Sequence, residues 1–175
     1  MIILGIDPGS RYTGFGLVNN HPTRLEYIHS GHIRVEGDAL PARLGHIYAE
    51  IGEVIRQYKP EQMGIENVFM SRNADSALKL GQARGAAICA AYQAGLEIAE
   101  YAPREIKQAI VGTGAANKEQ IEHMVKRLLG LRQDLQSDEA DGLAIAICHA
   151  QFYTTQQKSG LPAKMFKRRS GGRRR

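Results

Sequence analysis

Residues 2–16, IILGIDPGSRYTGFG, form the stretch that decides the fold. Four apolar residues among the first five positions precede a single carboxylate, Asp7, and a Pro-Gly turn follows at once. A short apolar run bounded by turn residues predicts a buried strand over 2–7, and the Gly-spaced run after the turn predicts a second strand over 13–18. The pair should form an antiparallel hairpin with Asp7 at the rim of a sheet. A lone charge is costly there because desolvation disfavours the ionised form, although a simple capping role toward the amides of the turn is the alternative.

The rest of the chain predicts alternating strands and helices. Apolar residues at three- and four-residue steps indicate the helices, and short apolar runs between turn residues indicate the strands. The further strands are expected over 25–35, 62–68 and 97–102, and the helices over 41–58, 75–93, 103–111, 118–129 and 138–152. Three consecutive strands favour an antiparallel meander, whereas strands separated by helices favour parallel neighbours. The sequence thus predicts an α/β fold, a five-stranded mixed sheet with helices on both faces, which is the layout of the ribonuclease H-like nucleases.

Composition indicates a globular protein outside the membrane. The 175 residues are 43% hydrophobic and 23% charged, which suits one compact domain with a sizeable core. No apolar run approaches the ~20 residues that a membrane span needs, and the first residues lack the basic region typical of a signal peptide. Cys89 and Cys148 lie in Ala/Ile-rich helical stretches without zinc-ligand spacing, which predicts core thiols in a reducing compartment. We therefore expect a cytoplasmic protein.

The net charge of +5 is unevenly distributed. Residues 158–175 carry eight Lys or Arg and no acid, so residues 1–157 carry 15 basic and 18 acidic side chains. The end of the chain is rich in Gly, Ser, Arg and Lys, a composition that predicts disorder. Such tails contact phosphate backbones without sequence preference, although a merely solubilising extension is the alternative. We expect a folded domain over residues 1–155 and a disordered basic tail over residues 156–175.

Four acidic residues stand at the ends of predicted elements. Asp7 and Glu66 end strands, and Asp138 and Asp141 lie in the first turn of the last helix. Asp138 and Asp141 share one helical face with Cβ atoms ~5–6 Å apart, where like charges repel unless a cation lies between them. Asp138 alone could instead be a helix cap. Oxygen ligands from several elements favour Mg²⁺ or Mn²⁺, and two such ions ~4 Å apart can activate water for phosphodiester hydrolysis.

Basic and aromatic residues near these acids suggest contact with nucleic acid. Phe69 follows Glu66 in a polar loop, where it could pack as a lid or stack on an unpaired base, which contributes ~1–3 kcal/mol. Lys107 and Lys118 flank a Gly-Thr-Gly loop and could stabilise negative charge on a phosphate. Each basic side chain could equally be a solvated surface charge. The candidate phosphate contacts are Arg72, Lys79, Arg84, Arg104, Lys107 and Lys118.

Four stretches match one family closely. They are ILGIDPGSRYTGFG (3–16), IENVFMSRNADSALKLGQARGAAI (65–88), APREIKQAIVGTGAANKEQ (102–120) and SDEADGLAIAICHA (137–150). Through them the sequence resembles the RuvC family of bacterial Holliday junction resolvases over nearly all of residues 1–155. The resemblance implies a homodimeric, Mg²⁺-dependent endonuclease with a ribonuclease H-like fold. Such enzymes nick two strands of like polarity at a four-way DNA junction in recombination and repair, and act with a branch-migration motor, the RuvA and RuvB proteins.

The resemblance also assigns roles to residues. The family's catalytic and metal-binding acids fall on Asp7, Glu66, Asp138 and Asp141, its loop aromatic falls on Phe69, and its phosphate-contacting lysines fall on Lys107 and Lys118. Arg72 lies in the same loop as Phe69, and we expect it to contact DNA. The implied mechanism uses two Mg²⁺ ions per subunit, bridged by Asp7, with Mn²⁺ able to substitute. The helix after Asp75 resembles the family's dimer helix.

One departure from the family lies beside the acids. Many relatives carry Ala where this chain has Glu139 and Gly142. Glu139 should point away from the metal face, so we do not count it as a ligand.

Two other functions compete with this interpretation. The Asp-Pro-Gly turn resembles the one that opens ATPase and sugar-kinase domains, but those chains usually have a second domain, and no G-x-x-x-x-G-K-[ST] loop is present. A junction-binding module without catalysis is the third possibility. It accounts poorly for four acids in comparable positions, because clustered carboxylates repel DNA.

Overall fold

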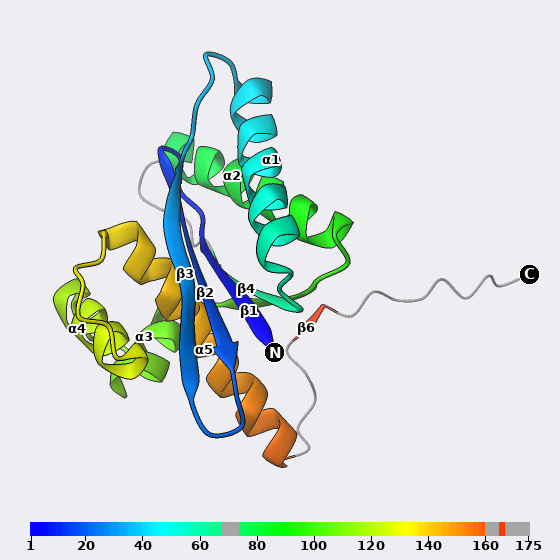
Figure 1. Cartoon of the computed structure of the whole chain (residues 1–175). Helices are drawn as coiled ribbons and strands as arrows, with labels where there is room; N and C mark the ends of the chain where they lie inside the picture. The colour runs from blue at the N-terminus through cyan, green and yellow to red at the C-terminus, as the bar shows by residue number, and fades with distance from the viewer. Residues whose placement is uncertain (68–73, 160–164, 167–175) are drawn as a thin grey trace, which may run out of the picture.

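The fold is built around one mixed sheet, shown in Figure 1, a computed structural model that describes residues 1–67, 74–159 and 165–166. The strands are β1 (Ile2–Asp7), β2 (Tyr12–Asn20), β3 (Leu25–Arg34), β4 (Gln62–Glu66), β5 (Glu97–Tyr101) and β6 (Met165–Phe166), in the spatial order β3-β2-β1-β4-β5-β6. The first three strands pair antiparallel, β4 pairs parallel with β1 and β5, and β6 pairs antiparallel with β5. This arrangement confirms the ribonuclease H-like prediction.

Helices cover both faces of the sheet (Figure 1). The helices are α1 (Leu40–Tyr58), α2 (Ala74–Gln93), α3 (Pro103–Val111), α4 (Lys118–Leu129) and α5 (Ser137–Ser159). Side chains along β1 alternate between two hydrophobic cores, one on each face of the sheet. Ile3 packs with the apolar residues of α3, α4 and α5, whereas Leu4 and Ile6 pack with those of α1 and α2. Helix α5 is buried on every side over residues 142–150, which are apolar except for His149, as expected of a helix enclosed by other elements.

Local sequence signals set the helix ends. The Asn117 side chain accepts a hydrogen bond from the Gln120 amide, and the Gln120 side chain accepts one from the Asn117 amide, both at 2.9 Å. This reciprocal cap satisfies amides that the first turn of α4 leaves unpaired. Helix α1 stops at Lys59, whose φ of 49° is left-handed, directly before Pro60.

The structure differs from the sequence prediction at the carboxyl end. Helix α5 continues to Ser159 rather than ending near Phe152, so the expected domain boundary at residue 155 falls inside a helix. Residues 153–159 contain no Gly or Pro, and the hydroxyls of Thr154 and Thr155 donate to the carbonyls four residues earlier, at 2.8 Å. The polar composition of residues 156–159 predicts disorder, but these residues are helical because they extend a helix whose earlier turns are packed against the sheet.

Strand β6 is a second difference, since it adds a sixth strand to the expected five. Its two residues lie beyond the predicted start of the tail and pair with Ile98 and Ala99 of β5. Cys89 also departs from prediction, because its side chain is exposed on α2, whereas Cys148 is buried as expected. Among the described residues no helix is long and apolar enough to cross a membrane.

Candidate active site

The two strand-end acids meet at the centre of the sheet. Strands β1 and β4 run parallel with Ile6 beside Ile65, so Asp7 and Glu66 follow side by side at the carboxyl ends of adjacent strands. Their side chains hydrogen-bond each other, which requires one of the two to keep a proton. Burial first, and then the charges of Glu66, Asp141 and Asp138, raise the pKa of Asp7 to about 8. The pKa of Glu66 is also raised, chiefly by burial.

Glycines in β1 and β2 let α5 approach the sheet at backbone distance. A Cβ on Gly14 would lie 2.0 Å from the carbonyl oxygen of Asp138, and a Cβ on Gly16 would lie 2.5 Å from the amide nitrogen of Leu143. A Cβ on Gly5 would lie 2.2 Å from the carbonyl oxygen of Gly142. Because only residues without a Cβ permit this contact, the Gly-spaced strand brings the first turn of α5 against the end of β1.

This packing brings three acids into one cluster. Carboxylate oxygens of Asp7, Asp138 and Asp141 all lie within 4.8 Å of one another, and each residue is half-buried. Glu66 joins the cluster through its hydrogen bond to Asp7. The donors that meet here among the residues the structure describes are carboxylate oxygens, which hard divalent cations such as Mg²⁺ prefer. A cation between these carboxylates would offset their mutual repulsion, which adds to burial in raising the pKa of Asp7.

Both predicted lysines line the same cleft as the acids. The cleft has a volume of about 220 Å³, and its walls include Asp7, Glu66, Asp141, Lys107 and Lys118. The Lys118 ammonium lies 2.8 Å from Asp141. Burial lowers the pKa of Lys118, but the hydrogen bond and charge of Asp141, with the charges of Asp138 and Asp7, raise it overall. The Lys118 side chain is 59% exposed, so solvent screens this pair and it contributes little to stability.

Other predicted contacts lie elsewhere. Phe69 and Arg72 fall outside the described residues. Arg84 has partners within the protein, because its guanidinium pairs with Glu100 of β5 and its Nε donates to the carbonyl of Glu66 at 3.1 Å. Arg84 therefore fixes the end of β4. Lys79 pairs with Asp75 on the surface of α2 at 2.6 Å.

Glu139 is tied to its own helix end. Its carboxylate accepts a hydrogen bond from the amide of Gln136 at 3.2 Å, in the manner of a first-turn cap. Among the described residues, the carboxylates close enough to share one metal ion are those of Asp7, Asp138 and Asp141. Glu139 is not one of them.

Sequence reasoning missed a buried polar chain that joins α5 to the sheet. His149 Nδ1 lies 2.7 Å from the hydroxyl of Tyr101, and His149 Nε2 lies 2.8 Å from the side-chain oxygen of Gln62. Burial lowers the pKa of His149 to about 4, so the ring is neutral and donates to one partner while accepting from the other. Neither spacing nor composition indicates these contacts, because the partners are 48 and 87 residues apart.

Comparison with known proteins identifies the family. Residues 3–149 match the family described as crossover junction endodeoxyribonuclease RuvC. The chain is 57% identical over 156 residues to the protein of that name from Tolumonas auensis, covering 89% of this chain and 88% of the relative. It is 56% identical over 172 residues to the one from Pseudomonas entomophila, covering 98% and 97%.

Solved structures agree with the sequence match. Thermus thermophilus RuvC in complex with a Holliday junction substrate superposes with a TM-score of 0.83 at 35% identity, covering 89% of this chain and 96% of that one. The yeast mitochondrial resolvase Ydc2, at 10% identity and a TM-score of 0.60, shares the fold. The chain belongs to the RuvC family of crossover junction endodeoxyribonucleases.

Proposed function

We propose that this protein is a metal-dependent endonuclease that resolves four-way DNA junctions by paired nicks in strands of like polarity, in recombination and repair. One observation carries the proposal, namely that carboxylate oxygens of Asp7, Asp138 and Asp141 converge within 4.8 Å in a chain of the RuvC family. A junction-binding module would gain nothing from such a cluster, because carboxylates repel phosphates unless a cation lies between them.

Asp7, Glu66, Asp138 and Asp141 are the proposed catalytic and metal-binding residues. Their oxygen-only donor set fits Mg²⁺, with two ions per subunit, and Mn²⁺ can replace it. When bound, such ions supply an activated water and stabilise the leaving oxygen of the phosphodiester. Asp7 would hold a cation as the ionised carboxylate, so metal binding would be favoured where the proton retained by its raised pKa is released.

Lysines and an aromatic residue complete the proposed DNA site. Lys107 and Lys118 stand on the cleft wall, where their ammonium groups can stabilise charge that develops on the scissile phosphate. The Lys118 ammonium also lies 2.8 Å from the Asp141 carboxylate. Phe69 and Arg72 are proposed to contact DNA near the branch point on the family resemblance, as they lie outside the described residues.

We propose a homodimer formed through α2. Leu78 on this helix is 62% exposed, and no atom of the described residues lies within 4 Å of where a Cβ on Gly81 or Gly85 would stand. A second copy of α2 could approach such a face closely. Two-fold symmetry would then present two sites to two strands of a junction. We also propose that the protein acts with the RuvA and RuvB proteins, which form a branch-migration motor. We further propose that it is cytoplasmic.

The basic end of the chain is proposed as an accessory DNA contact. We retain a nuclease domain over residues 1–155 and a basic tail from residue 156, with residues 156–159 continuing α5. Residues 167–175 carry six Lys or Arg and no acid, a charge that favours the DNA backbone.

A synthetic mobile four-way junction, beside a linear duplex of the same sequence, tests the function. We expect paired nicks in the junction alone with Mg²⁺, and none with EDTA. Glu66→Gln should abolish cleavage while junction binding persists, since it removes a ligand charge and leaves the surface intact. Binding without cleavage under every divalent metal would contradict catalysis, and tight ATP binding without junction binding would favour the ATPase alternative.

A further inference from the structure

A row of side chains crosses the sheet beside the acid cluster. The ladders pair Asp7 with Gly14, and Gly14 with His32 of β3. Paired residues of antiparallel strands point to the same face, and Gly14 faces the Asp138 carbonyl, so His32 lies on the face that carries the acids. Two strand spacings of ~4.8 Å put the His32 Cα about 10 Å from that of Asp7. At ~3.4 Å per nucleotide, about three nucleotides of one strand span that distance.

The next row of the same face holds an exposed aromatic and an exposed cation. Tyr12 pairs with Arg34, two residues from Gly14 and His32, so both side chains share the face of the acids. The Tyr12 ring is 42% exposed and contacts the His32 ring edge to face, with centroids 5.4 Å apart. Among the described residues the buried Nδ1 of His32 has no hydrogen-bond partner. The described residues therefore leave the hydrogen-bonding capacity of this ring nitrogen unused at this corner of the sheet, where Tyr12, His32 and Arg34 lie.

Charge around this corner favours an anion. Arg11 and Arg34 are exposed, and Arg43 donates to the carbonyl of Ser10 in the turn after Asp7. The opposing charges nearby in the chain are Glu36 and Asp38, both exposed in the loop after β3. The corner thus places cations and an aromatic ring beside the acid cluster. This is the combination that binds unpaired nucleic acid, in which bases stack and phosphates meet cations.

We propose that Tyr12, His32 and Arg34 form a second DNA-contact surface, the hairpin rim, in which Tyr12 stacks on an unpaired base near the branch point and Arg34 contacts a neighbouring phosphate. The surface is continuous with the cleft through the Asp7–Gly14–His32 row. It rests on the proposed function, because only a substrate held at the acids would extend across this rim.

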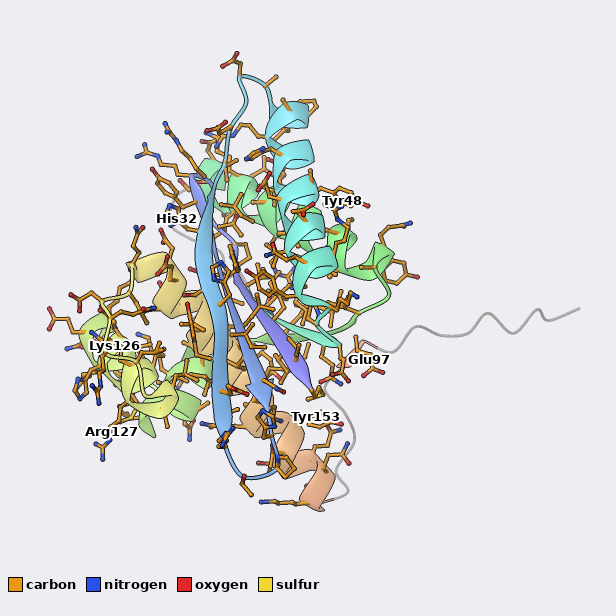
Figure 2. All side chains as sticks on the ribbon, viewed as in Figure 1. His32, Tyr48, Glu97, Lys126, Arg127 and Tyr153 are labelled. Atoms are coloured by element: carbon orange, nitrogen blue, oxygen red, sulfur yellow. The ribbon has the colours of Figure 1, made fainter. Side chains whose placement is uncertain are left out.

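Tyr48 offers a matched control. Its ring is 40% exposed, nearly the same as that of Tyr12, but it lies on α1, which packs against the opposite face of the sheet. Figure 2 shows His32 beside β3 and Tyr48 on the outer side of α1, apart from each other. Replacing Tyr48 therefore removes an exposed ring without touching the rim.

The test measures junction and duplex binding by the full chain carrying Asp7→Asn, so that no cleavage intervenes. Tyr12→Val keeps strand propensity and removes the ring, and we expect about 5- to 150-fold weaker junction binding with unchanged duplex binding. Tyr12→Phe should restore junction binding, and Tyr48→Leu should leave it unchanged. Arg34→Gln should weaken binding to both DNAs and lower the slope of log affinity against log salt by about 1.

A fluorescent base gives a second, local readout. With 2-aminopurine placed in turn at each position around the branch point, Tyr12→Val should raise the fluorescence of the complex at one position, and Tyr48→Leu at none. Wild-type junction affinity for Tyr12→Val, or an equal loss on duplex and junction, would overturn the stacking assignment. The Arg34→Gln slope remains informative even if Tyr12→Val fails to fold, and an unchanged slope would overturn the phosphate contact. Failure of the parent protein to bind any junction would refute the proposed function and this inference with it.

Discussion

The contact between Gly14 and the start of α5 allows a direct test of how the site is assembled. A Cβ on Gly14 would lie 2.0 Å from the Asp138 carbonyl oxygen, whereas ordinary contact begins at 3.4 Å. Gly14→Ala must therefore separate the two backbones by about 1.4 Å. Gly14 is not among the glycines with positive φ, so alanine fits its backbone conformation and the substitution changes the contact alone.

The expected consequence is a loss of rate that exceeds the loss of stability. A displacement of about 1 Å in a catalytic group can cost about 10²-fold in rate, and Asp138 and Asp141 move with the helix. Overpacking costs about 1–3 kcal/mol, which lowers Tm by roughly 2–12 °C in a chain of this size. The protein should remain folded at 25 °C and still bind the junction, since its surface is unchanged.

The assay is single-turnover cleavage of a four-way junction at 25 °C in saturating Mg²⁺, beside thermal melting and junction binding. Gly52→Ala is the control, because a Cβ there meets no atom of residues 1–67, 74–159 and 165–166 within 4 Å, and alanine improves helix propensity by up to ~1 kcal/mol. Its cleavage rate should equal that of the parent. A wild-type rate and unchanged Tm for Gly14→Ala would refute the idea that glycine contact positions the acids.

Three further predictions concern the acids and the buried polar chain. Asp141→Asn should lower the cleavage rate by at least about 10²-fold while junction binding persists, and a near-normal rate would exclude a ligand role. Without metal, the raised pKa of Asp7 means that the folded state binds more protons than the unfolded one between about pH 4 and 8. The free energy of unfolding in EDTA should therefore fall as pH rises through that window relative to Asp7→Asn, in urea titrations, and parallel pH profiles would contradict the shared proton. His149→Ala should destabilise the fold by about 2–5 kcal/mol, because it leaves the buried Tyr101 hydroxyl and Gln62 oxygen without their partner, and a denaturation midpoint like that of the parent would disprove this.

Much of the fold could be predicted because its signals are local. The apolar run before Asp7, the helical stripe that Pro60 ends and the Asn117 cap each lie within a few residues of the feature they determine. The prediction was wrong at the carboxyl end of the folded domain. Residues 156–159 have the composition of a tail, yet they are helical because they extend a helix already fixed by its packing.

The candidate site could be predicted in its members but not in its contacts. Position at strand ends and a helix start indicated Asp7, Glu66, Asp138 and Asp141, and the structure brings them together. Arg84 shows the limit, since its sequence context resembles that of a solvated surface cation, whereas its guanidinium pairs with Glu100 of β5. The pairing of a long charged side chain on a helix with a residue of a distant strand is not revealed by any local pattern.

The sequence by itself determined the first five strands, the five helices apart from the end of α5, the acids at their ends and the family. Only the tertiary structure decided that Gly14 touches the first turn of α5, that His32 stands in line with Asp7, and that His149 joins Gln62 to Tyr101. The physical reason is the range of the interactions. Periodicity and capping act between residues a few positions apart, whereas strand register and helix docking are fixed by contacts between residues that are distant in the chain and are satisfied only when the whole sheet is assembled.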